Sequence, residues 1–597
     1  MNTRIKRIRF SIISVLLLCA MTMQTHAATI TVTNTNDSGP GSLRQALANA
    51  NNGDRINFAV TGTIALTSGG LGVTKNVTIS GPGANQLAVD GNQGTLVFGL
   101  PPLRTVSISG LTIRNAQYGI SNDQGTVSVS NCVLSGNSIA GLYNYGLQSS
   151  GASMAVANSI ISNNSGTGAV NVFPFQGSAS NTLARNSADQ PICGGACMTI
   201  TNSVVSNNAD GGISNDGNSV FGTASLTVVN SNVSDNAGIG INNAGFEASA
   251  SATLLSTTVS GNSGGGVESG ACFGGAQLTI TDCTISGNSA DGGILAGCGT
   301  FLTVANSTIS DNLSGDNGGG ISGITAYVSI VNSTISGNSA GTSGGGIYCF
   351  ENTDVSIVNS TISGNLSGET GGGIYDSGFS DQNASIANST ISGNSAGTSG
   401  AGIYNVGLPL HAANSTISGN SAGTSGGGIF NFAGLVEIAN CTVSGNSASS
   451  GGGIYNSAAQ FGAVLQTANT IFNAGASGEN IFNDGGTVIS DGYNLSSDDG
   501  GGYLNGPGDQ INTDPLLGPL QNNGGPTLTH APLPGSPAID AGDPNFSPPP
   551  FNDQRGCPFD RVFNGRIDIG SFETQPPARP CSTPRPHPTP RPRPTPP

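Results

Sequence analysis

Residues 332–348 read NSTISGNSAGTSGGGIY, and the first seven letters recur in variant form along most of the chain. The first positions of the twelve copies lie 24 to 29 residues apart, except for one gap of 44. In every copy the fifth letter is Ser and the seventh is Asn. A fixed period of this length predicts stacked repeats, each contacting mainly its neighbours. The copies begin at positions 131, 158, 202, 230, 256, 282, 306, 332, 359, 388, 414 and 440.

One repeat contains three short strand signals separated by turn signals. Residues 334–336 alternate polar and apolar, as in a strand with Ile335 on one face, and Gly337-Asn338 turns the chain. The glycines at 344–346 break the chain again, a second strand begins at Ile347, and residues 355–357 form a third. Three strands and three turns in about 26 residues predict one coil of a parallel β-helix.

The sixth position of the motif is Gly, Asn or Asp in all twelve copies. These residues tolerate a left-handed backbone, so we expect a bend there in every coil. The Asn that follows is expected to stack on its equivalents above and below, where its amide satisfies turn backbone groups. This structural role accounts for the recurring Asn without a ligand or a catalytic function.

We therefore predict an all-β fold, a right-handed parallel β-helix of roughly 18 coils over residues 56–512. Exposed end coils need covering. Residues 28–55 are expected to form the N-terminal cap, with a short amphipathic helix over 41–51, and residues 513–574 form a Pro-rich C-terminal region suited to a second cap. Residues 575–597 are a Pro- and Arg-rich disordered tail, either a passive spacer or a tether to an anionic cell wall or lipopolysaccharide.

The first 27 residues resemble a signal peptide. Four cations precede an apolar stretch at 10–21, which is too short to span a membrane as a helix, and cleavage is expected before Ala28. No later segment is long and apolar enough for a transmembrane helix. The chain is therefore expected to be exported, and to be extracellular or associated with the cell surface or outer membrane.

Charge excludes one class of partner. Charged residues make up 8 % of the chain, and the formal net charge is −16. Between Arg185 and Arg555 there is no Lys or Arg. Nucleic-acid binding needs cations that neutralise phosphates, so we predict no nucleic-acid partner.

Ten cysteines remain after removal of the signal peptide, which suits an oxidising compartment. Cys132, Cys283 and Cys441 take the second motif position, usually Ser, and are interpreted as small buried substitutes for it. Three pairings are open on spacing: Cys272 with Cys298 on adjacent coils, Cys193 with Cys197 in a loop, and Cys557 with Cys581.

Three segments resemble known bacterial families. Residues 34–51, with GSLRQA at 41–46, resemble the N-terminal domain named for a Cys-Ser-Leu-Arg-Glu-Ala motif. The coils resemble the repeats of chlamydial polymorphic outer membrane proteins. Residues 514–573, with SPAIDAG at 536–542, DQRG at 553–556 and DIGSFE at 568–573, are similar to the choice-of-anchor Q domain. Together the resemblances imply a secreted or surface β-helix protein, and they carry no catalytic residues to transfer.

A polysaccharide lyase or glycoside hydrolase on a β-helix scaffold is the alternative function. The candidates for a lyase base are Arg104, Arg114 and Arg185, because no Lys or Arg occurs from residue 186 to residue 554. A hydrolase needs an acid and a base flanking the bond, and only the short matches at 352–354 and 498–499 are present. The His residues at 411, 530 and 587 are scattered. We predict no catalytic residues and leave enzymatic activity open, leaning against it.

An adhesin-like or structural interaction role has one candidate surface. Aromatic residues follow the inward Ile in five consecutive coils, so they are expected to point outward as a stripe. Such a stripe can stack on sugars or pack on a partner, or it can only stabilise coil stacking. Expected partners are surface glycans, the cell envelope, or a host or neighbouring surface protein. No cofactor or metal is predicted, and no motif supports structural calcium. The stripe comprises Tyr348, Tyr375, Tyr404, Phe430 and Tyr455.

Overall fold

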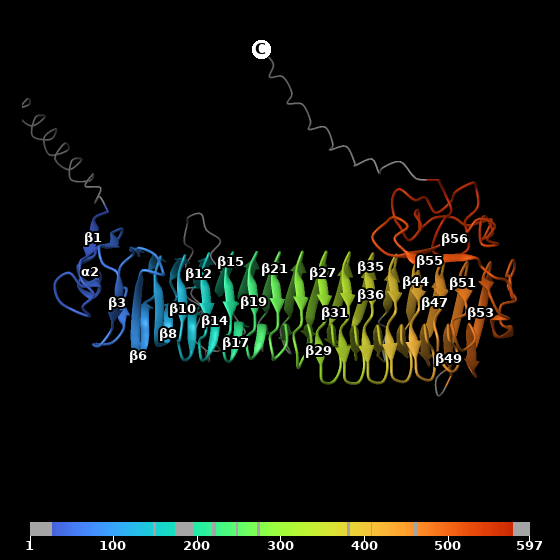
Figure 1. Cartoon of the computed structure of the whole chain (residues 1–597), viewed down its shortest axis with the longest axis horizontal. Helices are drawn as coiled ribbons and strands as arrows, with labels where there is room; N and C mark the ends of the chain where they lie inside the picture. Colours follow the sequence, from blue (N-terminus) through green and yellow to red (C-terminus); the bar gives the residue numbers. More distant parts are fainter. Residues whose placement is uncertain are drawn as a thin grey trace, which may run out of the picture.

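In the computed structural model the chain forms a long rod of stacked coils (Figure 1). The structure describes residues 27–146, 151–173, 195–217, 223–245, 249–271, 275–378, 383–407, 409–458 and 462–576. The predicted signal peptide up to residue 26, the tail from 577, and Cys193, Cys272 and Cys581 lie outside the described residues.

The fold is a right-handed parallel β-solenoid of about 16 turns, which confirms the predicted fold class. One face is an 18-stranded sheet of parallel strands. Its strands, in stacking order, are β1 (Thr29–Val32), β2 (Arg55–Phe58), β5 (Thr78–Ser80), β7 (Thr105–Ser109), β9 (Thr126–Ser130), β12 (Ala152–Ala157), β15 (Ala196–Thr201), β18 (Ala224–Val229), β21 (Ala250–Leu255), β24 (Ala276–Thr281), β27 (Thr300–Ala305), β31 (Tyr327–Val331), β35 (Asp354–Val358), β39 (Ala384–Ala387), β43 (Leu410–Ala413), β47 (Leu435–Ala439), β50 (Val464–Ala468) and β53 (Thr487–Gly492).

The repeat around residue 335 shows how one coil is built. Strand β32 (Thr334–Ser336) is followed by the short β33 (Ser339–Ala340), then β34 (Ile347–Phe350) and β35. Ile335 and Ile347 are fully buried, and the flanking outward residues are partly exposed. The apolar core therefore runs along the inside of the rod, as the alternation of apolar and polar residues predicts.

The predicted asparagine ladder is present. Asn338 is fully buried, and its Nδ2 donates to Asn365 Oδ1 at 3.0 Å and to the Ile309 carbonyl at 3.0 Å. The preceding Gly337 has φ of 66°, the left-handed bend expected there. The first motif position is also left-handed, with φ of 50° at Asn332, which sequence reasoning did not anticipate. The two left-handed residues lie on either side of β32 and fix the corners at both ends of this strand.

The N-terminal end is covered by α2 (Leu43–Asn49), the helix expected within 41–51. Ser42 caps it by accepting a hydrogen bond from Gln45 N at 3.2 Å, and Leu43 and Leu47 are buried against the first coils. Among the described residues, no helix is long and apolar enough to cross a membrane.

Residues 513–576 lie along the flank of the rod rather than across its end (Figure 1). This region contains β55 (Leu517–Gln521) and β56 (Thr529–Pro532) and contacts β40 (Thr390–Ser392), β44 (Thr416–Ser418), β48 (Thr442–Ser444) and β51 (Ile471–Asn473). The last coil is closed instead by η1 (Gly500–Gly502) and by Leu504, which joins the main core. We call residues 513–576 the flank region.

Candidate binding surfaces and polar centres

The five aromatic residues of the predicted stripe form a continuous stack. Tyr348 and Tyr375 are aligned in register, with ring centroids 5.0 Å apart and planes 15° apart. The next three steps span 4.8 to 5.4 Å with planes within 11°, and Phe482 extends the stack by a further step. All five side chains are half-buried.

Stacking covers the faces of the inner rings and leaves mainly their edges to solvent. Burial, with a smaller effect of the neighbouring Tyr375, raises the pKa of Tyr348 to about 12. This geometry favours the interpretation that the stripe stabilises coil stacking. A binding role for Tyr348, Tyr375, Tyr404, Phe430 and Tyr455 stays a prediction.

A second aromatic pair lies on the outer face of the 18-stranded sheet. Phe301 on β27 and Tyr327 on β31 stack with centroids 4.7 Å apart and planes 3° apart. They are 51 % and 47 % exposed. The pair borders a shallow groove of about 310 Å³ that continues over β35 and β39. Sequence reasoning missed this groove, although two aromatic residues one period apart were a detectable signal.

The groove has a polar side next to its aromatic side. Outward residues Thr303, Ser329, Ser356 and Ser385 follow one another on successive strands. Asp354 is aligned with Tyr327, and its Oδ1 accepts a hydrogen bond from Asn383 N at 3.2 Å.

The short sequence matches to a hydrolase pattern have structural roles. Thr353 is buried, and its hydroxyl donates to the Phe350 carbonyl at 2.8 Å and accepts from Ala326 N. Asp498 accepts hydrogen bonds from Asn480 N and Gly500 N at 2.8 and 2.9 Å, holding the turn that closes the last coil. Asp499 accepts from Gly501 N in the same turn.

The histidines and arginines considered as catalytic groups are dispersed. His411 Nδ1 lies 2.6 Å from Glu437 Oε2 on the outer face. His530 bridges Ser418 Oγ and the Gly518 carbonyl, joining the flank region to β44. Arg114 pairs with Asp90 at 2.9 Å near the N-terminal end, where Arg104 also lies. Arg185 and His587 are outside the described residues.

A second asparagine ladder, not recognised from the sequence, runs inside the rod. Asn144 Nδ2 donates to Asn171 Oδ1 at 2.8 Å, and Asn431 Nδ2 donates to Asn456 Oδ1 at 2.8 Å. Between Ser269 and Asn405 the aligned positions are instead Ala296, Gly323, Cys349 and Asp376. This interruption hid the ladder from a search for a regular period.

Asp376 is the one acidic residue in this interrupted stretch. It is 1 % exposed, and neither carboxylate oxygen has a hydrogen-bond partner among the described residues. Burial, with a smaller contribution from the Asp354 carboxylate, raises the pKa of Asp376 to about 7. The aligned Cys349 is fully buried, which raises the pKa of its thiol.

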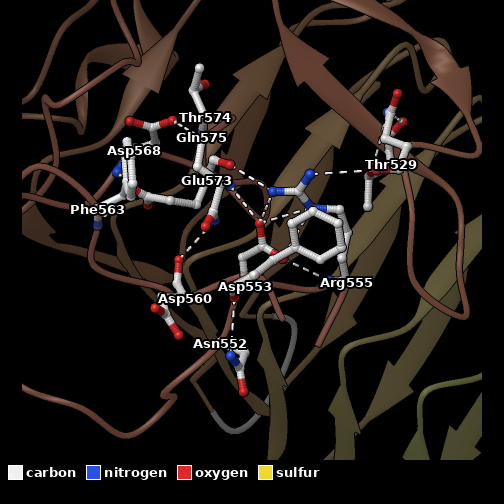
Figure 2. A network of polar contacts seen from close by, with 12 residues as sticks. Thr529, Asn552, Asp553, Arg555, Asp560, Phe563, Asp568, Glu573, Thr574 and Gln575 are labelled. Atoms are coloured by element: carbon white, nitrogen blue, oxygen red, sulfur yellow. Dashed lines mark hydrogen bonds and ion pairs between the residues drawn. The ribbon is translucent and has the colours of Figure 1, made fainter. Parts of the chain in front are cut away.

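The motif residues of the flank region form a buried polar centre (Figure 2). Arg555 Nη2 and Asp553 Oδ2 lie 2.6 Å apart, and the guanidinium carbon lies 3.7 Å from the Phe559 ring centroid and 3.6 Å from that of Phe572. Arg555 Nη2 also donates to the Glu573 carbonyl at 2.7 Å. The DQRG and DIGSFE segments are thus held together by one charged and aromatic cluster.

Gln554 and Ser571 join this centre to the rod. Thr416 Oγ1 donates to Gln554 Oε1 at 2.6 Å, and Gln554 Nε2 donates to Thr390 Oγ1 at 2.9 Å. Ser571 N donates to Thr442 Oγ1 at 3.1 Å. The outward Thr of the repeat is therefore used here as a docking site, which explains why the flank region lies along the side of the rod.

Three carboxylates in the flank region gather closely. One oxygen from each of Asp540, Asp568 and Glu573 lies within 4.8 Å of the others. Asp568 already accepts from Asp540 N and Thr574 N, and Glu573 accepts from Asp568 N. Burial, with repulsion from Asp568, raises the pKa of Glu573 to about 8. The absence of a metal site stays a prediction, because this spacing would allow the three groups to share an ion.

The cysteines at the Ser position behave as predicted. Cys132, Cys283 and Cys441 are buried free thiols, and Cys283 Sγ takes the place of a Ser hydroxyl by accepting from Thr257 N at 3.4 Å. Cys298 is also free, so the pairing of Cys298 with Cys272 does not form. Its position is partly exposed on a turn between coils. Cys197 and Cys557 are disulfide-bonded, and their expected partners lie outside the described residues.

A family model described as a right-handed β-helix region matches residues 175–309 and 269–430. A search of curated proteins finds no match. Among solved structures, pectate lyase Pel9A is 13 % identical over 92 % of this chain and 96 % of its own, with a TM-score of 0.22.

Two further solved structures give similar values. The catalytic unit of a GH87 α-1,3-glucanase from Streptomyces thermodiastaticus strain HF3-3 is 14 % identical over 78 % of this chain and 71 % of its own, with a TM-score of 0.23. A mannuronic acid-specific polysaccharide family 6 lyase from human gut microbiota is 11 % identical over 69 % and 86 %, also with a TM-score of 0.23. The family model and the strand ladders of the structure show that the fold is a right-handed parallel β-helix, and no activity follows from the similarities to solved structures.

Proposed function

We propose that this chain is an exported bacterial protein, located at the cell surface or released, that acts as an adhesin-like or structural interaction protein without catalysis. The sequence of residues 1–27 supports export. The resemblances of residues 34–51, the coils and residues 514–573 to secreted and surface proteins support a location outside the cell.

One observation supports the absence of catalysis in this proposal: the residues that resemble catalytic groups make contacts that hold the fold together. Thr353 and Asp498 hold turns, and His530 joins the flank region to the rod. A general acid or base must reach the bond it acts on, and groups already committed to turn and docking contacts are poorly placed to do so. A long rod with an uncovered face suits recognition of a large or repeated partner.

The competing proposal is a polysaccharide lyase or glycoside hydrolase, and one experiment separates the two. The purified chain is incubated with a panel of neutral and anionic polysaccharides while new reducing ends and unsaturated ends are measured. We expect binding to at least one surface polysaccharide or cell-envelope preparation, and no new chain ends. Chain ends that form in proportion to protein concentration would contradict the proposal.

The location is tested separately. The full chain is produced in a Gram-negative host with its N-terminal segment, and intact cells are treated with protease before fractionation. We expect the mature protein to lack residues 1–27 and to be either accessible on the cell or released into the medium. Retention of an uncleaved chain in the cytoplasm would overturn this part.

A further inference from the structure

We propose that the groove beside Phe301 and Tyr327 binds a segment of neutral polysaccharide lying along the rod axis. This inference rests on the proposed function and deepens it, because it names the ligand class and the site. The site is distinct from the predicted stripe of Tyr348 to Tyr455, which lies on strands of another sheet.

The first argument is the availability of an aromatic face. Phe301 covers one face of Tyr327, since the rings are parallel and 4.7 Å apart. The residue aligned with Tyr327 on the other side is Asp354, whose side chain is too short to cover a phenol ring. The second face of Tyr327 therefore borders the groove, which extends over Asp354 and Asn383. Inner rings of the long stack, such as Tyr375, have a ring on both sides and offer no such face.

The second argument is the cost of leaving these two rings exposed. The aligned outward positions on preceding strands are occupied by Ser225, Ser251 and Gln277. Placing Phe and Tyr in this polar column leaves about half of each side chain in water. An exposed apolar area rimmed by polar groups is typical of a recognition site, because a ligand that covers it recovers the burial.

The third argument is the row of hydrogen-bonding groups next to the rings. Thr303, Ser329, Ser356 and Ser385 present hydroxyls at steps of about 4.8 Å along the axis. Asp354 adds an acceptor beside the ring. A pyranose has an apolar face that packs on an aromatic ring and hydroxyls around its edge that pair with such groups. Because four such hydroxyls are aligned along the rod axis, the groove suits a chain of sugars better than a single sugar.

The negative charge of the groove favours a neutral polysaccharide over an acidic one. The carboxylate of Asp354 lies in the groove, and the sequence has no Lys or Arg from 186 to 554 to pair with an acidic sugar. An anionic chain would place like charges together without compensation, which disfavours binding.

The interior is irregular in the same coils. The second asparagine ladder is interrupted at Ala296, Gly323, Cys349 and Asp376, each of which lies at or next to the end of the strand that comes before β27, β31, β35 or β39. Elsewhere the ladder residue holds the turn that follows its strand, as when Asn431 Nδ2 donates to the Gly434 carbonyl at 2.8 Å. In these coils the residues of the inner ladder and of the outer polar column both depart from the repeat. Such departures are expected at functional sites, where residues are selected for binding rather than for stacking.

The test compares four forms of the full chain on immobilised polysaccharides: the wild type, a groove variant, a control variant and Asp354→Asn. The groove variant is Phe301→Ala with Tyr327→Ala. The matched control is Tyr118→Ala with Tyr143→Ala, which removes two neighbouring rings, 5.1 Å apart, outside both the groove and the predicted stripe. The probes are neutral glucans, xylans, mannans and galactans, with alginate and polygalacturonate as anionic comparisons. Circular dichroism and thermal melting verify that each form is folded.

We expect saturable binding to at least one neutral polymer, weakened at least about tenfold in the groove variant and changed less than about threefold in the control. Asp354→Asn, which keeps the groove shape, is expected to weaken binding by less than the double variant. Equal binding by the wild type and the groove variant would overturn the inference and leave the proposed function standing. Binding only to anionic polymers, or to no polysaccharide, would also overturn it. Cleavage of a bound polymer would instead overturn the proposed non-catalytic function.

Discussion

Replacing Asp376 by Asn is expected to stabilise this protein, and to do so increasingly as pH rises. Asp376 occupies a position of the second asparagine ladder, between Cys349 and Asn405, and its carboxylate is buried without a hydrogen-bond partner among the described residues. In the intact ladder each Nδ2 donates to the next Oδ1, as Asn405 does to Asn431 at 3.1 Å. An amide at 376 is expected to donate to Asn405 in the same way.

The magnitude follows from the pKa of Asp376. Burial raises it from 3.8 to about 7, so the folded state holds the proton more tightly than the unfolded state. The stability contributed by protonated Asp376 is full below pH 3.8 and is lost as pH rises through 7. A pKa difference of this size corresponds to about 4 kcal/mol of unfolding free energy. Restoring one ladder hydrogen bond adds about 1 kcal/mol.

The assay is thermal unfolding of the wild type and Asp376→Asn between pH 4 and pH 8.5. At pH 8 we expect the variant to melt about 4 °C higher, because about 5 kcal/mol is divided by an unfolding entropy of about 1.2 kcal/mol/K for a chain of this length; the difference should shrink toward pH 4. Asp311→Asn, at an exposed turn, is the matched control and should follow the wild type. A difference between Asp376→Asn and the wild type that does not depend on pH, or that has the opposite sign, would show that the buried Asp376 carboxylate does not destabilise the folded chain.

Three further predictions concern the ladders, the flank region and the thiols. Asn338→Ala should lower the unfolding free energy by about 2–4 kcal/mol in urea denaturation, because it leaves buried backbone and amide groups unpaired. The control Ser336→Ala, on the outer face, should change the unfolding free energy by less than about 1 kcal/mol. Arg555→Ala should destabilise docking of the flank region by about 3–5 kcal/mol, because the Asp553 carboxylate is left buried and unpaired. Limited proteolysis should then remove residues after 513 while the circular dichroism of the rod persists, and an unchanged digestion pattern would contradict this. Of the five described free cysteines, Cys298 should be alkylated fastest, because Cys132, Cys283, Cys349 and Cys441 are buried with raised thiol pKa values; peptide mass spectrometry after brief iodoacetamide treatment measures the order.

The predicted aromatic stripe shows how sequence can place residues without deciding what they do. Alternation along a strand put Tyr375 and Tyr404 outside, and the repeat aligned them. Whether their faces would be open depended on the separation and tilt of rings in neighbouring coils, 5.4 Å and 6° for this pair. Those values are set by strand stacking, which brings together side chains 29 residues apart in the sequence.

The groove and the second asparagine ladder were missed for a related reason. Both depend on columns of residues from many coils, and in both columns the regular pattern is broken. Phe301 and Tyr327 replace polar residues in an outer column, while Gly323 and Asp376 interrupt an inner one. A search for periodic residues does not find such sites, because it detects the residues that successive coils have in common and not the positions where one coil differs.

From the sequence it was possible to predict the parallel β-helix, the first asparagine ladder and the burial of Cys132, Cys283 and Cys441. These features depend on local steric limits and on short-period patterns of apolar and polar residues, and the same pattern recurs in twelve copies. Only the tertiary structure decided that residues 513–576 lie on the flank, which rings are covered, and where a groove opens. Those outcomes depend on contacts between segments far apart in the sequence, such as Thr416 with Gln554, and no local pattern specifies which partners meet.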